Sequence, residues 1–284
     1  MYQVFYNKKI NENSYEMKVK APLCVKKALP GQFVIIMAYS DSERIPLTIY
    51  DYDREEGSIT LIYQVVGAST LELTTVKDSL YGIVGPLGNA NEICKNPDNY
   101  RDKRIVYVAG GVGVAPVYPQ VKYLKSCGIE VDVIYGARSA SLYLIRDKLE
   151  KEARKVFYAT DDGSFGTKGF VTDILEEKRE NYDLCVTIGP VIMMKNVCEV
   201  CKKYGIASIV SMNPLMVDGS GMCGACRCEV DGKPKFACIH GPEFDGSKVN
   251  FDLALKRMNV YKNEEAVKME EMKEKLAKRG VSYE

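Results

Sequence analysis

The sequence predicts a multidomain protein in which an antiparallel β-barrel precedes an α/β domain with a parallel sheet. Three observations indicate this fold. Residues 1–98 contain short β-branched and aromatic runs separated by turn residues. Residues 99–212 alternate buried strands with segments of helical spacing. Residues 213–250 form a glycine-rich segment with several cysteines, and residues 251–284 predict a helical tail.

Composition limits the classes of function. With 284 residues, of which 46% are hydrophobic and 27% charged, the chain can form two or three ordinary cores. A net charge of +1 gives no electrostatic basis for binding nucleic acid or a membrane surface. The chain starts without a signal-peptide core and has no run of membrane-span length, so we expect a cytoplasmic protein whose ten cysteines are reduced. One histidine and no tryptophan leave cofactor-borne redox chemistry as the best candidate.

The barrel is expected from runs of strand length in the first third of the chain. These runs are YEMKVKA, QFVIIMAY, SITLIYQVV and LYGIVG, and they are separated by LPGQ, DREEGS and GPLGNA. Many short strands without helices between them predict an antiparallel barrel.

The α/β domain is expected from the change of pattern near residue 100. A strand, IVYVAGG, leads into a helix that ends at Gly128, and the strands EVDVIYGAR, KVFYAT and DLCVTIG follow. Helices are expected near 141–154, 169–177 and 190–204. Alternation of this kind predicts a parallel sheet covered on both faces. Farther on, a charged helix at 263–280 is expected to dock by a narrow stripe of Ala266, Met269, Met272 and Leu276.

Two segments could bind phosphate groups. In GGVGVAP, residues 110–116, glycines follow a strand and precede a helix, so that backbone can approach a pyrophosphate. The segment ends in Ala-Pro and does not match G-x-G-x-x-G, so an ordinary tight turn stays open. In the barrel, Arg44 with Ser69 and Thr70 could hold a diphosphate, although taken alone they favour a surface arginine and a routine turn.

The order of the motifs resembles that of the ferredoxin–NADP reductase superfamily. The barrel carries PGQFV, R-x-P-L-T, G-x-S-T and GPLG, and the α/β domain carries GGVGVAP and a late GPVIMM. The resemblance covers residues 1–204. With the cysteine segment, the whole chain resembles electron-transfer subunits of dihydroorotate dehydrogenase. It resembles more closely the small subunits of NADH-dependent reduced ferredoxin:NADP+ oxidoreductases, also described as sulfide dehydrogenases.

This resemblance implies that the barrel binds FAD and that the α/β domain binds NAD(H). The implied FAD-binding residues are Arg44 at the pyrophosphate, Pro46, Leu47 and Thr48 at the flavin, Ile62, Tyr63 and Gln64 at the ribityl chain and ring, and Gly67, Ser69 and Thr70 at the phosphate. The implied nucleotide-binding residues are Gly110, Gly111 and Gly113, with Gly189 and Pro190 beside the other end of the nucleotide.

No catalytic side chain is assigned. Many members of the superfamily carry a cysteine just before the late Gly-Pro, where this sequence has Ile188. Isoleucine can pack but cannot act as a thiol. The resemblance therefore implies that FAD and nicotinamide carry the chemistry and that the protein aligns them.

The residues after the third strand of the α/β domain favour NAD(H) over NADP(H). Relatives that use NADP place serine and arginine there, and this chain has Asp161 and Asp162. A carboxylate repels a 2′-phosphate and can accept from a ribose hydroxyl. Arg138, after the second strand, is the residue that could reverse this preference.

The cysteine segment predicts a [2Fe–2S] cluster. Plant-type sites use C-x4-C-x2-C and a distant cysteine. Here Cys223, Cys226 and Cys238 fill three of these positions, and Asp218 stands in the first. A carboxylate is anionic like a thiolate, although its oxygen is harder. Asp218 is favoured over Cys228 as the fourth ligand, and water or a backbone group is a third option.

Other readings of the cysteines stay open. Four thiolates could form a zinc knuckle, although the paired spacing of a zinc ribbon is missing. A second C-x2-C, Cys198 and Cys201, is interpreted as core packing on a helix. The structural cysteines are expected to be Cys24, Cys94, Cys127 and Cys185, and His240 is expected to pack over the cluster loop.

Together these observations predict an NAD(H)-dependent flavin oxidoreductase subunit. Electrons would pass between NAD(H), FAD and the cluster, and then to or from a partner, because the chain shows no site for an organic substrate. The resemblance implies a heterodimer with a larger flavin and iron–sulfur subunit and electron bifurcation among NAD+, NADPH and ferredoxin. The alternatives are an electron-transfer subunit of dihydroorotate dehydrogenase and a non-catalytic iron–sulfur or zinc scaffold.

Overall fold

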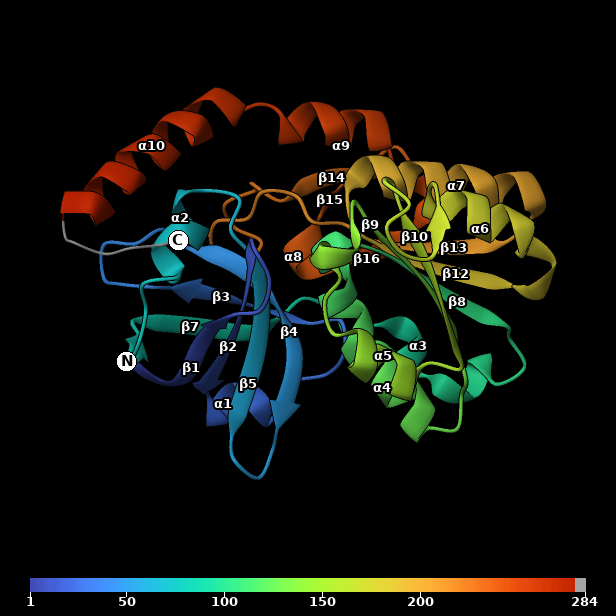
Figure 1. Cartoon of the computed structure of the whole chain (residues 1–284), viewed down its shortest axis with the longest axis horizontal. Helices are drawn as coiled ribbons and strands as arrows, with labels where there is room; N and C mark the ends of the chain where they lie inside the picture. Colours follow the sequence, from blue (N-terminus) through green and yellow to red (C-terminus); the bar gives the residue numbers. More distant parts are fainter. Residues whose placement is uncertain (279–284) are drawn as a thin grey trace.

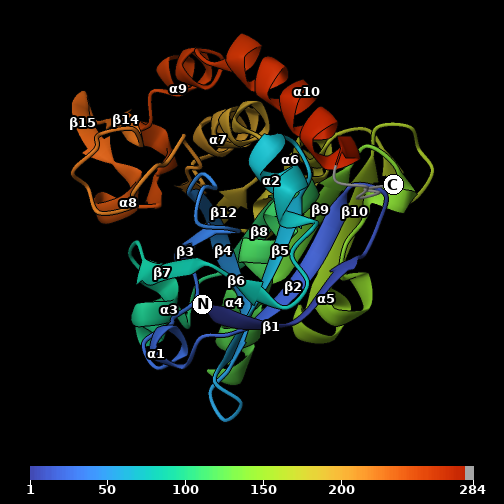
Figure 2. The ribbon, with the colours of Figure 1, turned by 90° about the vertical axis from the view of Figure 1, so that its left-hand side faces the viewer.

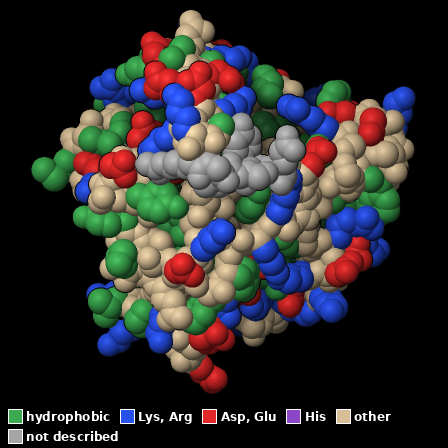
Figure 3. Space-filling view, turned by 60° about the vertical axis from the view of Figure 1, so that its left-hand side comes forward, with side chains coloured by type: hydrophobic (Ala, Val, Ile, Leu, Met, Phe, Trp, Pro, Cys, Tyr) green, Lys and Arg blue, Asp and Glu red, His purple; other side chains and the backbone are tan. Residues whose placement is uncertain are grey.

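The computed structural model describes residues 1–278, which form a barrel, an α/β domain and a cysteine segment with a helical tail (Figure 1). Charged side chains of both signs are spread over the face in Figure 3, as the small net charge leads one to expect. No helix of the described chain is both long enough and apolar enough to cross a membrane.

The first part is the predicted antiparallel barrel. A seven-stranded sheet in the order β6-β1-β2-β5-β4-β3-β7 curls into a nearly closed barrel (Figure 2). Its strands are β1 (Tyr2–Lys9), β2 (Ser14–Lys20), β3 (Phe33–Met37), β4 (Ile45–Asp53), β5 (Ser58–Gln64), β6 (Ser79–Leu80) and β7 (Gly82–Leu87). Alternate residues such as Met17, Val19, Ile59 and Leu61 point inward and are fully buried. The sequence missed three short helices in and after the barrel, α1 (Pro22–Val25), α2 (Ala68–Leu73) and α3 (Glu92–Lys95).

The second part is the predicted parallel sheet, in the order β11-β10-β9-β8-β12-β13-β16. Its strands are β8 (Ile105–Gly110), β9 (Asp132–Ala137), β10 (Lys155–Thr160), β11 (Thr167–Lys168), β12 (Leu184–Ile188), β13 (Ala207–Ser211) and β16 (Glu243–Asp245). All neighbours are parallel except β16, which pairs antiparallel with β13. Three strands of this sheet, β11, β13 and β16, were not predicted from the sequence. Because β16 follows the cysteine segment in the chain, that segment is tied to the edge of this sheet.

Helices cover both faces of the parallel sheet (Figure 1). They are α4 (Val114–Ser126), α5 (Arg146–Glu152), α6 (Val171–Glu177) and α7 (Val191–Tyr204), and short 3₁₀ turns occur at Pro97–Tyr100, Gly111–Gly113, Ala140–Leu142, Arg179–Asn181 and Gly246–Lys248. Along β8, Tyr107 packs with the α4 and α5 side, whereas Val106 and Val108 pack with the α6 and α7 side. This alternation is the two-residue period of a strand that is buried on both faces.

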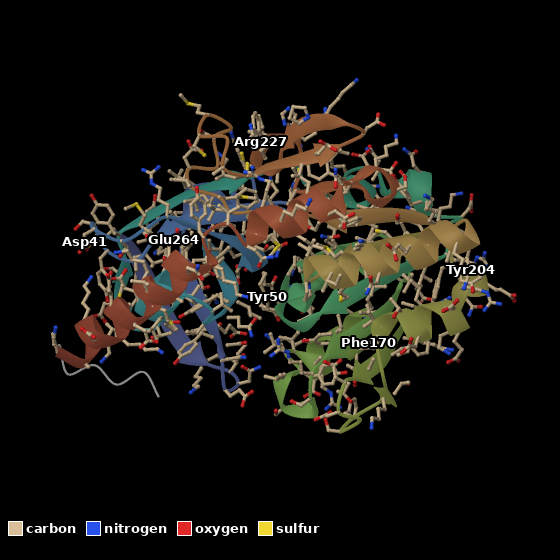
Figure 4. All side chains as sticks on the ribbon, turned by 90° about the horizontal axis from the view of Figure 1, so that it is seen from above. Asp41, Tyr50, Phe170, Tyr204, Arg227 and Glu264 are labelled. Atoms are coloured by element: carbon tan, nitrogen blue, oxygen red, sulfur yellow. The ribbon has the colours of Figure 1, made fainter. Side chains whose placement is uncertain are left out.

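The third part is a hairpin with three helices. Its elements are β14 (Arg227–Val230), β15 (Lys233–Phe236), α8 (Ala237–His240), α9 (Phe251–Met258) and α10 (Lys262–Lys278). In Figure 2, α10 runs from α9 across to α2 of the barrel. In the view from above in Figure 4, Glu264 marks this helix, with Asp41 at the barrel edge.

The stripe expected on this helix is only partly buried. Leu276 is buried, Met269 and Met272 are partly buried, and Ala266 is exposed. The last two residues of the expected helix, 279 and 280, lie outside the described residues.

The barrel and the α/β domain meet through an apolar contact between β4 and α4. Tyr50 of β4, labelled in Figure 4, is fully buried. Its ring centroid lies 5.0 Å from that of Tyr118 on α4. Lys122 of α4 forms an ion pair with Asp51 at 2.9 Å beside this contact. The contact holds the two domains side by side, and a cavity opens between them.

Candidate cofactor cavity and cluster loop

A cavity of about 1020 Å³ lies between the barrel and the carboxyl ends of the parallel strands. Ends of parallel strands are the usual place for nucleotides in α/β domains, because helix starts and free backbone groups gather there. The predicted cofactor residues that line this cavity are Pro46, Leu47, Thr48, Ile62, Tyr63, Gln64, Thr70, Gly110, Gly111, Gly113, Asp161, Gly189 and Pro190. The structure therefore brings together residues that are far apart in the sequence.

Four predicted residues lie outside the cavity wall: Arg44, Gly67, Ser69 and Asp162. Arg44 is exposed, next to Ile45 in the wall. The Ser69 hydroxyl donates to Glu43 Oε2 at 2.8 Å. The Thr70 hydroxyl, although in the wall, accepts from the backbone N–H of Gly67 at 3.1 Å and so serves the turn.

The barrel side of the cavity is mostly backbone and apolar side chain. The ring of Tyr63 points away from the cavity into the barrel core, where its hydroxyl donates to Asn7 Oδ1 at 2.9 Å. Tyr63 thus faces the cavity with its backbone, while its ring belongs to the barrel core. Leu47 and Ile62 add apolar surface of the kind that a planar aromatic ring requires.

Glycine is required in the turn after β8 for two different physical reasons. A side chain at Gly113 would collide with the carbonyl of Ile188, and one at Gly110 would collide with Met193. Both glycines are therefore required by packing against β12 and α7. Gly111 differs, because its φ of +55° lies in the left-handed region and no atom lies within 4 Å of the place a Cβ would take. The space over Gly111 leaves its backbone accessible to a ligand.

The nucleotide end of the cavity places opposite charges near each other. Asp161 and Arg138 both line it. Asp162 is turned to Ser164, whose backbone N–H donates at 2.9 Å and whose hydroxyl donates at 2.6 Å, and these bonds lower the pKa of Asp162. Of the two aspartates, only Asp161 lines the cavity.

Several polar or aromatic residues of the cavity were not predicted from the sequence. Phe170 lies at the rim with 65% of its surface exposed, and Gln120, Asn196, Ser211 and Asn213 also line the wall. No signal in the sequence pointed to Phe170, because it falls inside the helix expected near 169–177 and only the structure shows that α6 begins after it, at Val171. The others come from helix faces and strand ends whose position depends on the tertiary structure.

The cysteine segment brings the predicted cluster ligands together as two pairs. The Sγ atoms of Cys226 and Cys238 lie 3.2 Å apart, and both residues are 2% exposed. Asp218 lies beside Cys223 in the exposed loop, where hydrogen bonds from the Ser220 backbone and then from Cys223 lower the pKa of Asp218. Within residues 1–278, no three such side chains converge on a point suited to a single metal ion. A two-iron cluster takes two protein ligands on each iron, which fits two pairs better than one compact group.

Cys228 has a different neighbour. It lies on β14, and its thiol donates to the carbonyl of Lys235 across the hairpin at 3.6 Å. His240 is likewise turned to the hairpin, where its Nδ1 accepts from the backbone N–H of Phe236 at 3.0 Å.

Most cysteines outside the cluster loop are buried in the cores. Cys24, Cys94, Cys185, Cys198 and Cys201 are buried, and Cys127 is half-buried. Burial raises the pKa of Cys198 to about 12. Both cysteines of α7 take part in core packing, as predicted, but in different clusters: Cys201 packs with Val106 and Cys185, and Cys198 packs with Val210 and Phe251.

One apolar cluster joins the cavity to the cysteines. It contains Phe33 and Ile35 of β3 with Met216, Cys226 and Cys238. Phe33 and Met216 also line the cavity. A side chain at Gly219 would collide with Leu87 and Ile35, so the loop lies directly against the barrel. The cluster loop and the cofactor cavity are thus neighbours, separated by a thin apolar layer.

Comparison with protein families matches two parts of the chain. Residues 107–199 match the oxidoreductase NAD-binding domain. Residues 213–250 match the iron–sulfur cluster binding domain of dihydroorotate dehydrogenase B. These matches cover the two regions in which the structure places the glycine turn and the paired cluster ligands.

Individual relatives cover nearly the whole chain. A dihydroorotate dehydrogenase B (NAD+) electron transfer subunit homolog of Thermotoga maritima is 42% identical over 92% of this chain and 92% of its own length. The electron transfer subunit of Clostridium acetobutylicum is 34% identical over 87% of this chain and 95% of its own length. A chain of the solved NADH-dependent reduced ferredoxin–NADP oxidoreductase, studied for flavin-based electron bifurcation, is 38% identical. It superposes with a TM-score of 0.88 over 95% of this chain and 97% of that chain.

Proposed function

This chain belongs to the family of dihydroorotate dehydrogenase B electron-transfer subunits and their homologues, and from this premise we propose that it is the small subunit of an electron-bifurcating complex. It is an NAD(H)-dependent flavin oxidoreductase subunit with FAD and a [2Fe–2S] cluster. The observation that carries the proposal is the layer of apolar side chains, Phe33, Met216, Cys226 and Cys238, that lies between the cavity and the loop of the predicted iron–sulfur ligands. A thin apolar layer lets electrons pass between two cofactors while it excludes water.

The matched length favours a bifurcating complex over dihydroorotate oxidation by a small margin, since the Thermotoga maritima homolog is matched over 92% of both chains. The electron transfer subunit of Clostridium acetobutylicum is matched over 95% of its length but covers 87% of this chain. The bifurcating relative is matched almost end to end in both chains.

The cavity residues fit FAD and a nicotinamide nucleotide. When bound, FAD would accept a hydride from NADH and pass electrons on singly. Leu47 and Ile62 would exclude water from the flavin, and the backbone at Pro46 and Tyr63 would hold its polar edge. The open backbone of Gly111 would receive the nucleotide, and Asp161 would accept from its ribose. Ile188 would pack against the nicotinamide and hold it close to the flavin, and no side chain here would supply or remove a proton.

The cysteine segment fits a cluster held by two pairs of ligands. Cys226 and Cys238 would hold one iron, and Asp218 and Cys223 would hold the other. Cys228 is not needed in this arrangement, because its thiol bonds to the Lys235 carbonyl. The cluster would then lie between the barrel and the outer surface of the segment.

A partner subunit would dock over the cluster loop. Exposed apolar side chains lie on that loop and beside it, namely Leu215, Val217 and Met222 on the loop and Ile239 on α8. Met222, next to the exposed Cys223, is 88% exposed. Apolar side chains gathered at the exposed side of an electron-transfer loop suit contact with another protein. We propose that this partner is a larger subunit with its own flavin and iron–sulfur centres, as in a heterodimer.

Anaerobic reduction of the full chain tests the function. After loading with FAD, iron and sulfide, NADH should bleach the flavin absorbance and then produce the EPR signal of a reduced [2Fe–2S] cluster. Flavin reduction without any cluster signal would contradict electron passage between the two sites. Co-purification from the native host, read by mass spectrometry, should yield a larger flavoprotein. Recovery of a dihydroorotate-oxidising subunit would favour the alternative.

A further inference from the structure

Glu243 on β16 lies where the three parts of the chain meet. Its carboxylate accepts hydrogen bonds from Asn91 Nδ2 at 2.7 Å and from Gln120 Nε2 at 2.9 Å. Asn91 follows the last barrel strand, Gln120 is on α4, and Glu243 comes soon after the cluster cysteine Cys238. A single carboxylate therefore joins the barrel, the α/β domain and the cysteine segment.

Glu243 has no close compensating charge. Both of its donors are neutral amides that are fully buried, and no ion pair within residues 1–278 includes it. The titratable groups that interact with it are Cys94 and Lys95 on α3 and Tyr107 on β8, and Lys95 is the only cation among them. Removal from water raises the pKa of Glu243 to about 7.

The surroundings can accommodate the protonated form. A carboxylic acid must donate its O–H to an acceptor, and Gln120 Oε1 is buried without a hydrogen-bond partner. Rotation of the Gln120 amide would turn this oxygen toward Glu243. Gln120 and Pro242, the residue before Glu243, both line the cofactor cavity. The carboxylate is thus one side chain away from the cavity.

We infer that Glu243 is a proton-binding residue of the electron-transfer reaction. It takes up one proton from solvent when electrons enter the neighbouring cavity or cluster, and it returns that proton to solvent when they leave. The carboxylate becomes a carboxylic acid, and no electron resides on it. The carboxylate is held between two buried amides, but part of the surface of Glu243 remains exposed, so solvent is close to it. Proton uptake offsets negative charge that would otherwise accumulate at the junction of the three parts.

Infrared difference spectra of the loaded full chain, reduced minus oxidised, test this inference. At about pH 8, where the oxidised form is mainly carboxylate, reduction should produce the C=O stretch of a protonated carboxylic acid. The signal should vanish on reoxidation and be missing in Glu243→Gln. Glu92→Gln is the matched control, because Glu92 also accepts from a side-chain amide, Asn96 Nδ2 at 2.6 Å, but is exposed. This control should keep the signal.

The midpoint potentials give a second readout. Proton uptake on reduction makes the flavin or cluster potential fall as pH rises, and this slope should be smaller in Glu243→Gln. Glu243→Asp keeps a titratable group and should retain part of the slope. No carboxylic-acid signal in the wild type, or the same signal in Glu243→Gln, would overturn the inference.

The inference rests on the proposed function, and the same samples separate the two. If NADH fails to bleach the flavin, the proposed function is wrong. If NADH or dithionite bleaches the flavin without a carboxyl signal, only the role of Glu243 is wrong.

Discussion

The walls of the cofactor cavity and the cluster loop next to it are built differently. The cavity is formed by strand ends, buried apolar side chains and a turn whose glycines pack against β12 and α7. Residues 212–226 of the cluster loop contain no helix or strand, and Cys223 at its tip is exposed. A site built from packed strands keeps its shape without a ligand, whereas such a loop depends on the bonds its ligands make to the metal.

Substitution of the cluster ligands should have the largest effect, because it should abolish iron binding in the loop and leave FAD binding in the cavity intact. Cys226→Ser and Cys238→Ser should each lose the cluster, because one iron then lacks a thiolate, while FAD content stays near wild type. Cys228→Ser is the matched control and should retain iron and the EPR spectrum. Asp218→Ala should make the cluster labile, and Asp218→Cys should keep a cluster with an altered spectrum. Loss of the cluster in Cys228→Ser with tolerance of Asp218→Ala would identify four cysteines as the ligands.

A packing change in the cavity should destabilise the whole domain. Gly113→Ala forces a methyl group onto the Ile188 carbonyl and should lower the free energy of unfolding by about 1–3 kcal/mol. Nucleotide binding should weaken with it, and both can be measured by urea unfolding and by NADH titration. Gly67→Ala is the control, since no atom lies within 4 Å of its added Cβ. Equal stability of the two variants would contradict a cavity built by packing.

The preference for NADH over NADPH tests the role of the Asp161 carboxylate in the cavity wall. NADH should reduce the flavin on the order of tenfold faster than NADPH, equivalent to about 1.4 kcal/mol, because Asp161 repels a 2′-phosphate. In stopped-flow experiments, Asp161→Ser should bring the rates of flavin reduction by NADH and by NADPH closer together. Asp162→Asn should leave the two rates as far apart as in the wild type, because the Asp162 carboxylate is turned to Ser164. Similar rates with both nucleotides in the wild type would point to Arg138 as the deciding residue.

The junction between cavity and cluster loop should show a pH dependence of stability. The pKa of Glu243 is raised from 4.5 to about 7 on folding, so the folded state binds this proton more tightly. Its stabilising contribution is present in full below pH 4.5 and is lost as pH rises through about 7. Relative to Glu243→Gln, the wild type should lose on the order of 3 kcal/mol across this window in thermal unfolding. A difference that is constant with pH would exclude this linkage.

The smallest effect is expected where the C-terminal helix reaches the barrel. Lys275 on α10 forms an ion pair with the buried Glu72 of α2 at 3.1 Å. Lys275→Met should cost about 1 kcal/mol of stability, since among residues 1–278 the Glu72 carboxylate then keeps only the Ser42 hydroxyl as a partner. FAD should dissociate faster, because α2 carries Thr70 of the cavity wall. Lys268→Met, in an exposed pair with Glu271, should change neither quantity.

Local pattern was sufficient for most elements of the fold. Side-chain period and turn residues predicted β2, β3, β5 and β7 of the barrel, the alternation in the α/β domain and α7 at Val191–Tyr204, but they did not predict β1 at Tyr2–Lys9. Short elements such as β13, β16 and α2 were missed, because a few residues carry too little periodicity to be recognised. The type of cluster was also accessible from the sequence, because ligand spacing within one loop is a local property.

The tertiary structure decided which of these residues act together. It turned Asp162 to Ser164 and left Asp161 at the cavity, and it turned Cys228 to the hairpin while bringing Cys226 to Cys238. It also placed Glu243 beside Asn91 and Gln120, although 152 and 123 residues separate them in the chain. Side-chain period and turn chemistry depend on neighbours in sequence, so the sequence by itself determined the elements, their order and the residue types available for chemistry. Contacts between distant segments depend on how complete layers pack, and only the folded chain determines those.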